Sequence, residues 1–143
     1  MDDLLRRLER AHRLYVDLVA GLTPELLASH LGDLRSNTIA EQLWCVVGAR
    51  ESYTKAALEG GWQGFTSSLD ASSPVDPSVV VGSLNSSFAV VSSAIDAGVA
   101  PEGRAWLMDL LEHETQHHGQ LIRYLYGLGI PRPQSWREHY ALD

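Results

Sequence analysis

The chain has 143 residues, enough for one sizeable core, and we expect residues 1–143 to form a single domain. The formal net charge of -7 argues against a nucleic-acid partner, because phosphate binding requires a basic face and the 11 Lys and Arg residues are scattered. No apolar run approaches the roughly 20 residues that cross a bilayer, and the N-terminus, rich in Asp and Arg, does not resemble a signal peptide. We therefore expect a cytoplasmic protein without a membrane partner.

A first amphipathic helix is predicted to begin at Asp2 or Asp3, because acidic residues are favoured at a helix N-terminus. We interpret His12, which falls on its buried face, as a packed and hydrogen-bonded core residue; a histidine that points toward a metal site is the alternative. Residues 21–35 then form a connector with a short helix that Thr23 can cap. The buried face of the first helix combines residues three and four apart: Leu4, Leu5, Leu8, His12, Tyr15, Val19 and Leu22.

The second helix is predicted to open at Thr38, since Thr38 and Glu41 have the spacing of a capping box. Arg50 lies on its inward stripe, and a buried arginine needs an anion, for which Glu114 is the favoured partner and a bound substrate the alternative. Cys45, the single cysteine, sits on the flank of the stripe and cannot form an internal disulfide. The stripe consists of Ile39, Gln42, Leu43, Val46, Arg50, Tyr53 and Ala57.

Residues 59–75 are rich in glycine and serine and are predicted to be an irregular connection. Fully extended, this stretch could span at most about 56 Å, whereas a 20-residue helix is about 30 Å long. The connection could therefore run the length of a bundle and leave the second and third helices parallel. Trp62 and Phe65 would either pin the connection to the helices, which is the more common role, or act as a lid.

The third helix is predicted to begin at Asp76 and Pro77 and to end at Gly98. Val79 to Val81 alone would suit a strand, because valines are mediocre helix formers. After the fourth helix, residues 130–133 are expected to form an extended strap and Trp136 to Leu142 a short final turn. The apolar positions of the third helix alternate by three and four: Val81, Leu84, Phe88, Val91 and Ile95.

The fourth predicted helix, from Pro101 to Gly129, carries the most informative motif of the chain. His113 and His117 are four residues apart, which places their side chains on one flank of the helix, within reach of a single ion. Neutral imidazole is the commonest protein metal ligand, so we predict a metal site rather than two solvated histidines. An apolar stripe runs beside them: Leu107, Leu110, Leu111, Leu121, Leu125 and Leu128.

Residues 113–117 also match the H-E-x-x-H pattern of zinc metalloproteases, in which the glutamate serves as general base. The extended protease pattern continues with a glycine and a third histidine, but Gln120 and Arg123 occupy those positions here. No sheet that could present a peptide is predicted. A zinc hydrolase with Glu114 as its base is therefore the weaker alternative.

Two phrases of the sequence, Asn37 to Cys45 and His113-x-x-x-His117-His118-Gly119-Gln120, resemble the DinB-like (YfiT-like) superfamily of four-helix bundles. The order of segments and the closing stretch up to Trp136 extend this resemblance over nearly the whole chain. It implies an all-α four-helix bundle with a long crossover between helices two and three. Such proteins are often dimeric and hold a divalent metal ion with three histidines. Some relatives are thiol-dependent enzymes, among them bacillithiol S-transferases and a mycothiol-dependent isomerase.

Carried over residue by residue, the resemblance implies that His113 and His117 are metal ligands. The third ligand of the family is a histidine on helix two, and the matching position here is Cys45. A thiolate could preserve the site, with zinc or nickel as the favoured ion. Equally, a buried free cysteine is a common inert core residue, and the site could have decayed.

The predicted catalytic residues are Glu114 and Arg50. Glu114, one residue from a ligand, could act as general base or orient an imidazole, and Arg50 could neutralise an anionic substrate. His118 and Gln120 are expected to serve packing and hydrogen bonding. Glu41 is a conceivable fourth ligand, but its capping role already explains it.

The leading hypothesis is a metal-dependent thiol S-transferase that acts in detoxification or stress response. Its partners would be a low-molecular-weight thiol, an electrophilic small molecule and a second copy of the chain as a homodimer. This hypothesis requires an open coordination position beside a pocket. There the ion would lower the pKa of the bound thiol or water. The alternative is a non-catalytic, stress-related bundle with a degenerate metal site and no cleft above the histidines.

Overall fold

A computed structural model describes residues 2–72 and 74–143. These residues contain six α-helices and no β-strand, so the all-α prediction is confirmed. Val79 to Val81, which alone would have suited a strand, lie inside a helix. The helices are α1 (Asp3–Ala20), α2 (Pro24–Leu27), α3 (Ile39–Glu59), α4 (Pro77–Ala97), α5 (Pro101–Gly127) and α6 (Gln134–Tyr140).

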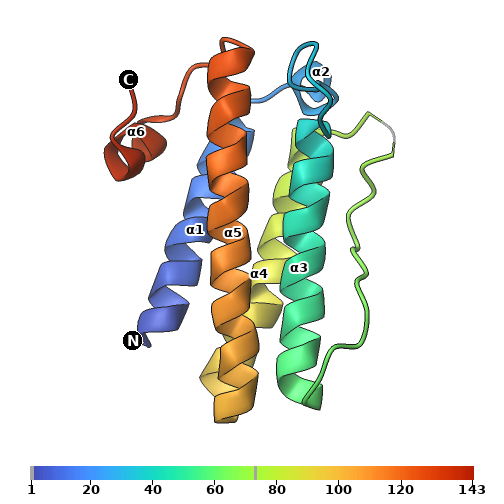
Figure 1. Ribbon diagram of the computed structural model, residues 1–143, viewed down its shortest axis with the longest axis vertical. Helices are drawn as coiled ribbons and strands as arrows, with labels where there is room; N and C mark the ends of the chain where they lie inside the picture. The colour runs from blue at the N-terminus through green and yellow to red at the C-terminus, as the bar shows by residue number, and fades with distance from the viewer. Residues whose placement is uncertain (1, 73) are drawn as a thin grey trace.

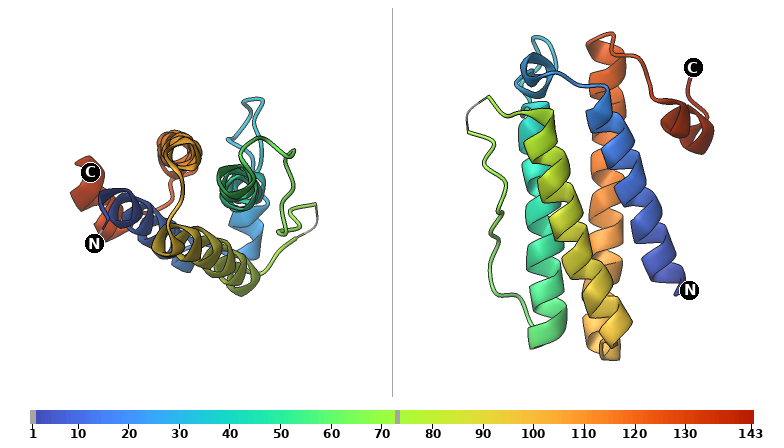
Figure 2. Two further views of the ribbon diagram at one scale, coloured as in Figure 1. Left: turned by 90° about the horizontal axis from the view of Figure 1, so that it is seen from below. Right: turned by 180° about the vertical axis from the view of Figure 1, so that it is seen from behind.

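The four long helices, α1, α3, α4 and α5, lie side by side (Figure 1). α3 and α4 run in the same direction, because the segment between them returns along the outside of α3 to the end where α3 begins (Figure 2). α1 and α5 run in the opposite direction. As a result α5 packs lengthwise against α3, and residues far apart in the sequence face one another across that interface.

Helix ends form where the local sequence predicts them. The Thr38 hydroxyl accepts a hydrogen bond from the Glu41 amide (3.0 Å), and the Glu41 carboxylate accepts one from the Thr38 amide (3.2 Å), so the capping box is confirmed. Asp2 caps α1 in the predicted position. Beyond α3 and α5, Gly60 and Gly129 adopt the left-handed conformation (φ 79° and 65°) that glycine tolerates best.

The final helix differs from its prediction by two residues, because α6 begins at Gln134 and ends at Tyr140 rather than covering Trp136 to Leu142. Trp136 anchors it: its indole is fully buried and donates a hydrogen bond to the Leu14 carbonyl of α1 (2.7 Å). The start of α6 is thus set by where this tryptophan docks, which depends on tertiary packing.

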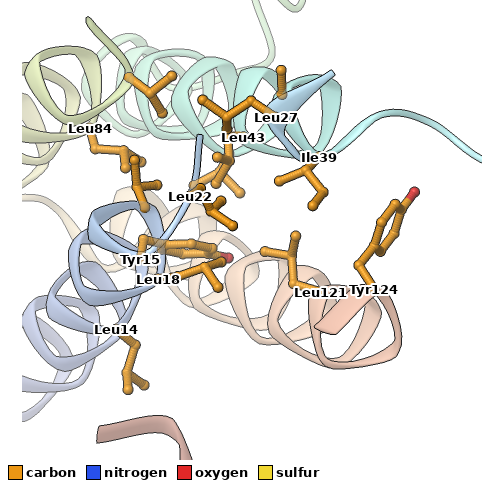
Figure 3. Close-up of a cluster of buried hydrophobic side chains, with 14 of the residues drawn as sticks. Leu14, Tyr15, Leu18, Leu22, Leu27, Ile39, Leu43, Leu84, Leu121 and Tyr124 are labelled. Atoms are coloured by element: carbon orange, nitrogen blue, oxygen red, sulfur yellow. The ribbon is translucent and has the colours of Figure 1, made fainter. Parts of the chain in front are cut away.

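The larger of two buried apolar clusters lies toward the end of the molecule where α2 packs. Figure 3 shows Leu18 of α1, Leu43 of α3 and Leu121 of α5 among the side chains that fill the space between the helices. Full burial of a leucine side chain contributes about 1.5–3 kcal/mol relative to exposure. Apolar burial is therefore the main force that holds the long helices together.

Of the described helices, α4 is the one long and apolar enough to cross a membrane by length and composition. This finding differs from the expectation that no segment could span a bilayer, which rested on the absence of an apolar run of about 20 residues. A core helix of a soluble protein passes the same test, and α4 packs against α1 and α3. This finding is weak support for a membrane role.

The segment between α3 and α4 is attached to α3 by side-chain contacts. Phe65 packs against Trp44, with a ring separation of 5.1 Å. The Ser52 hydroxyl both donates to the Thr66 carbonyl (3.2 Å) and accepts from the Thr66 amide (3.1 Å). These contacts support the pinning role for Phe65.

Two glycines of α5 give a matched test of how closely α3 and α5 approach. We expect Gly103→Ala to lower the free energy of unfolding by about 1–3 kcal/mol, because its methyl group would lie 2.5 Å from the Ala57 carbonyl oxygen of α3. Gly119→Ala meets nothing within 4 Å and should raise stability by about 0.5–1 kcal/mol. Urea unfolding of both variants measures the difference; equal effects would contradict the close approach.

Candidate metal centre

Cys45 of α3 and His113 and His117 of α5 come together across the interface of these two helices. Their ligand atoms all lie within 4.8 Å of one another, and Cys45 Sγ is 3.4 Å from His113 Nε2. One sulfur and two imidazole nitrogens form a donor set that suits zinc. The three predicted metal ligands are therefore assembled into a group that could hold a metal ion, here named the triad.

Gln42 fixes the orientation of His117. The His117 Nδ1 nitrogen lies 2.5 Å from Gln42 Oε1, and because an amide oxygen only accepts, Nδ1 carries the proton and donates. The other ring nitrogen, Nε2, is then unprotonated and available to an ion. This role was missed from the sequence, which placed Gln42 only on the buried stripe. The available signal was a glutamine on an apolar stripe, three residues before Cys45, that needed a buried partner.

The protonation states of the triad suit metal binding in different ways. Burial lowers the pKa of His117 to about 4, with the neighbouring His113 a smaller cause, and burial also lowers the pKa of His113. Both imidazoles are therefore neutral at pH 7, the form that binds metal. Burial raises the pKa of the Cys45 thiol, so this thiol must lose a proton when an ion binds.

The triad opens toward the surface on one side. His117 is buried, whereas Cys45 and His113 are half-buried. A cavity of about 460 Å³ lies between the start of α3 and the segment that follows it, and its lining includes Glu41 and Trp44 rather than the triad. In the described part of the chain, the triad lines none of the three main cavities, so the pocket expected beside an open coordination position is not shown. A ligand of the ion would instead approach from the exposed side of the triad, where Cys45 and His113 are half-buried.

Arg50 and Glu114 form a buried ion pair in the interior of the molecule. Arg50 Nε donates to Glu114 Oε1 (2.5 Å), and the two side chains are 0% and 1% exposed. Arg50 also donates to the Leu84 carbonyl (3.0 Å) and to His12 Nδ1 (3.1 Å). The hypothesis that Glu114 supplies the anion for Arg50 is confirmed. The Glu114 carboxylate is directed to this arginine, so the catalytic roles of both residues stay predictions.

His12 belongs to the buried cluster around Arg50 and not to the triad. Its ring stacks on Phe88 at 4.6 Å, and burial, together with the Arg50 charge, lowers its pKa to about 4. Because a guanidinium only donates, His12 Nδ1 is the acceptor of the Arg50 hydrogen bond. The interpretation of His12 as a packed, hydrogen-bonded residue is confirmed, although its side chain is half-buried rather than fully buried.

Of the remaining polar candidates, His118 serves packing and Glu41 serves capping. His118 is 1% exposed, and its Nδ1 lies 2.6 Å from the Tyr140 hydroxyl. This contact links α5 to the segment of α6, and the predicted packing role of His118 is confirmed. Glu41 is occupied by its capping box. Gln120 is exposed on α5, so the packing role expected for this residue is wrong.

Comparison with known proteins returned no match: no family model, no curated protein and no solved structure matches the chain. The resemblance to the DinB-like superfamily therefore stays an expectation. Function has to be argued from the triad and its surroundings.

We expect Gln42→Leu to weaken zinc binding by about 10- to 100-fold, because His117 loses the acceptor that fixes its tautomer and ring orientation. Gln120→Leu, at an exposed position, is the matched control and should leave the affinity unchanged. Competition with a chromophoric zinc chelator measures both. Equal affinities for Gln42→Leu and wild type would show that the hydrogen bond does not support a ligand.

Proposed function

We propose that this protein binds one zinc or nickel ion through Cys45, His113 and His117 and acts as a metal-dependent thiol S-transferase. One observation carries the proposal: a thiol and two neutral imidazoles from two helices converge within 4.8 Å. No carboxylate belongs to this group in the described part of the chain. The H-E-x-x-H hydrolase needs the Glu114 carboxylate to point at a metal-bound water, but this carboxylate is paired with Arg50, so the hydrolase is the less favoured function.

The proposal includes membership of the DinB-like superfamily, a four-helix bundle with a long crossover. Four long helices, with α3 and α4 parallel and their connection outside α3, support this assignment (Figure 1). The positions of His113 and His117 on α5 and of Cys45 on α3 support it further. We extend the proposal to a cytoplasmic homodimer, for which the resemblance and the composition are the grounds.

When bound, the ion would supply an open coordination position and lower the pKa of a thiol placed there. The chain contributes the three ligands and the Gln42 hydrogen bond that directs His117. In the transfer, the thiol releases its proton to solvent, and its sulfur forms a bond to an electrophilic carbon. The bond from that carbon to its leaving group breaks, and the leaving group departs with the electron pair. Detoxification of electrophiles is the proposed purpose.

The first test is the metal content of protein purified without a metal-affinity tag. We expect about one zinc or nickel ion per chain in the wild type and loss of the ion in both Cys45→Ala and His117→Ala. His139→Ala, on the exposed surface of α6, is the control and should keep its metal. Elemental analysis of all four proteins, before and after refilling with zinc, gives the answer.

The variants separate the possible roles of the cysteine. Loss of metal in His117→Ala alone would reduce Cys45 to an inert core thiol. A wild type that stays empty after refilling would refute the metal site and the S-transferase with it. That result would favour the non-catalytic bundle.

A further inference from the structure

Three aromatic side chains from three segments meet beside the triad: Tyr53 of α3, Trp62 of the connection and Trp106 of α5. The Tyr53 ring lies 5.2 Å from that of Trp62 and 6.2 Å from that of Trp106, and the two indoles stack at 6.0 Å. We name this group the aromatic wall. Its rings adopt the edge-on and offset arrangements that aromatic groups prefer.

The aromatic wall continues directly from the triad. The ring of Tyr53 is 6.1 Å from that of His113. Along the helices, Tyr53 follows Cys45 by two turns, about 12 Å, and Trp106 precedes His113 by two turns, about 10.5 Å. A molecule bound to the ion on the exposed side of the triad could therefore contact this wall.

The aromatic wall is accessible, and it carries no formal charge. Trp62 is 45% exposed, while Tyr53 and Trp106 are partly exposed, like Cys45 and His113. Pinning of the connection does not depend on Trp62 alone. Phe65 on Trp44 and the paired Ser52 hydrogen bonds already attach that segment to α3. Tyr53 and Trp106 also pack against an apolar cluster of the core, but part of the aromatic surface stays exposed next to the candidate metal site.

We propose that the aromatic wall is a binding subsite for an aromatic ring of a small molecule whose sulfur is coordinated by the ion. This inference rests on the proposed function and adds the substrate class: thiols, or thiol conjugates, that carry an aromatic group. An added ring can stack on an indole or meet Tyr53 edge-on. Such an aromatic pair contributes about 0.5–1.5 kcal/mol beyond its area burial, a preference of roughly two- to thirteenfold over a saturated ring.

The test compares two thiols of similar size and acidity, 2-phenylethanethiol and 2-cyclohexylethanethiol. Each is titrated anaerobically into cobalt-substituted protein, and binding is followed by the sulfur-to-cobalt absorption. We expect the aromatic thiol to bind about two- to thirteenfold more tightly. Trp62→Leu and Trp106→Leu should each reduce that preference while the cobalt spectrum without thiol stays unchanged. Phe65→Leu, in the same connection but outside the wall, is the matched control and should retain the preference.

Equal affinities of the two thiols in the wild type, or a preference that survives in both tryptophan variants, would overturn the subsite and leave the metal site standing. The wall would then serve only to pin the connection. Cobalt that binds without admitting either thiol would overturn the subsite and the S-transferase together. Failure to bind cobalt would refute the metal centre itself, and the subsite with it.

Discussion

Glu114→Gln is expected to lower the free energy of unfolding by about 3–5 kcal/mol. The substitution keeps the shape of the side chain but removes the charge that balances Arg50, which is 0% exposed. Arg50 cannot turn to solvent, because its other N–H groups are held by the Leu84 carbonyl and His12. An uncompensated guanidinium would then remain in a medium of low polarity. Urea unfolding of the metal-free protein measures the loss.

A double-mutant cycle tests whether this loss comes from the ion pair. Once Arg50 is replaced by methionine, Glu114→Gln should cost much less, with a coupling energy of about 2–3 kcal/mol. The exposed pair of Glu9 and Arg13, 4.0 Å apart on α1, is the matched control, and its cycle should give less than about 0.5 kcal/mol. Similar coupling in the two cycles would contradict a structural role for Arg50 and Glu114. Such a result would favour the predicted catalytic roles of both residues over a structural one.

Local signals in the sequence predicted the helix boundaries well, because a few neighbouring residues determine them. The Thr38 and Glu41 capping box and Gly60 beyond α3 act within one turn of the chain. The boundaries of α6 were wrong by two residues, because a distant contact decides them: Trp136 docks on the Leu14 carbonyl.

The ion pair of Arg50 with Glu114 could also be predicted from the sequence, although the two residues are 64 positions apart. A charged residue on an apolar stripe must meet an opposite charge, and few acids lie on other buried stripes. Glu114 was such an acid. The constraint is therefore chemical, and it holds without knowledge of how the helices are arranged.

The candidate metal site was predictable only in part. His113 and His117 share a flank because of helix geometry alone. Cys45 entered through the resemblance, since nothing in the spacing of residues 45 and 113 places them together. Gln42 and the aromatic wall depend on the register between α3 and α5, which the sequence does not specify.

The second large effect concerns pH. We expect the zinc affinity of the wild type to rise about tenfold per pH unit from pH 6.5 to 8. Burial raises the pKa of Cys45, so the thiol holds its proton throughout this range and must release it when zinc binds. Burial lowers the pKa values of His113 and His117, the latter to about 4, so both imidazoles are mainly neutral in this range and the thiol is the main source of released protons. One proton is thus released per ion, and a higher pH favours binding. Chelator competition at several pH values measures the slope.

Cys45→His is the control that isolates the thiol, because it restores the three-histidine set of the proteins that the chain resembles. This variant should still bind zinc, but its affinity should change little between pH 7 and 8, since neutral imidazoles bind without losing a proton. A wild-type slope near zero would mean that the ion leaves the thiol protonated, and Cys45 would then be an inert neighbour of two histidines. If the pH dependence of zinc affinity persists in Cys45→His, the released proton comes from another group. Cys45 is identified as the third ligand only if the pH dependence of zinc affinity is present in the wild type and absent in Cys45→His.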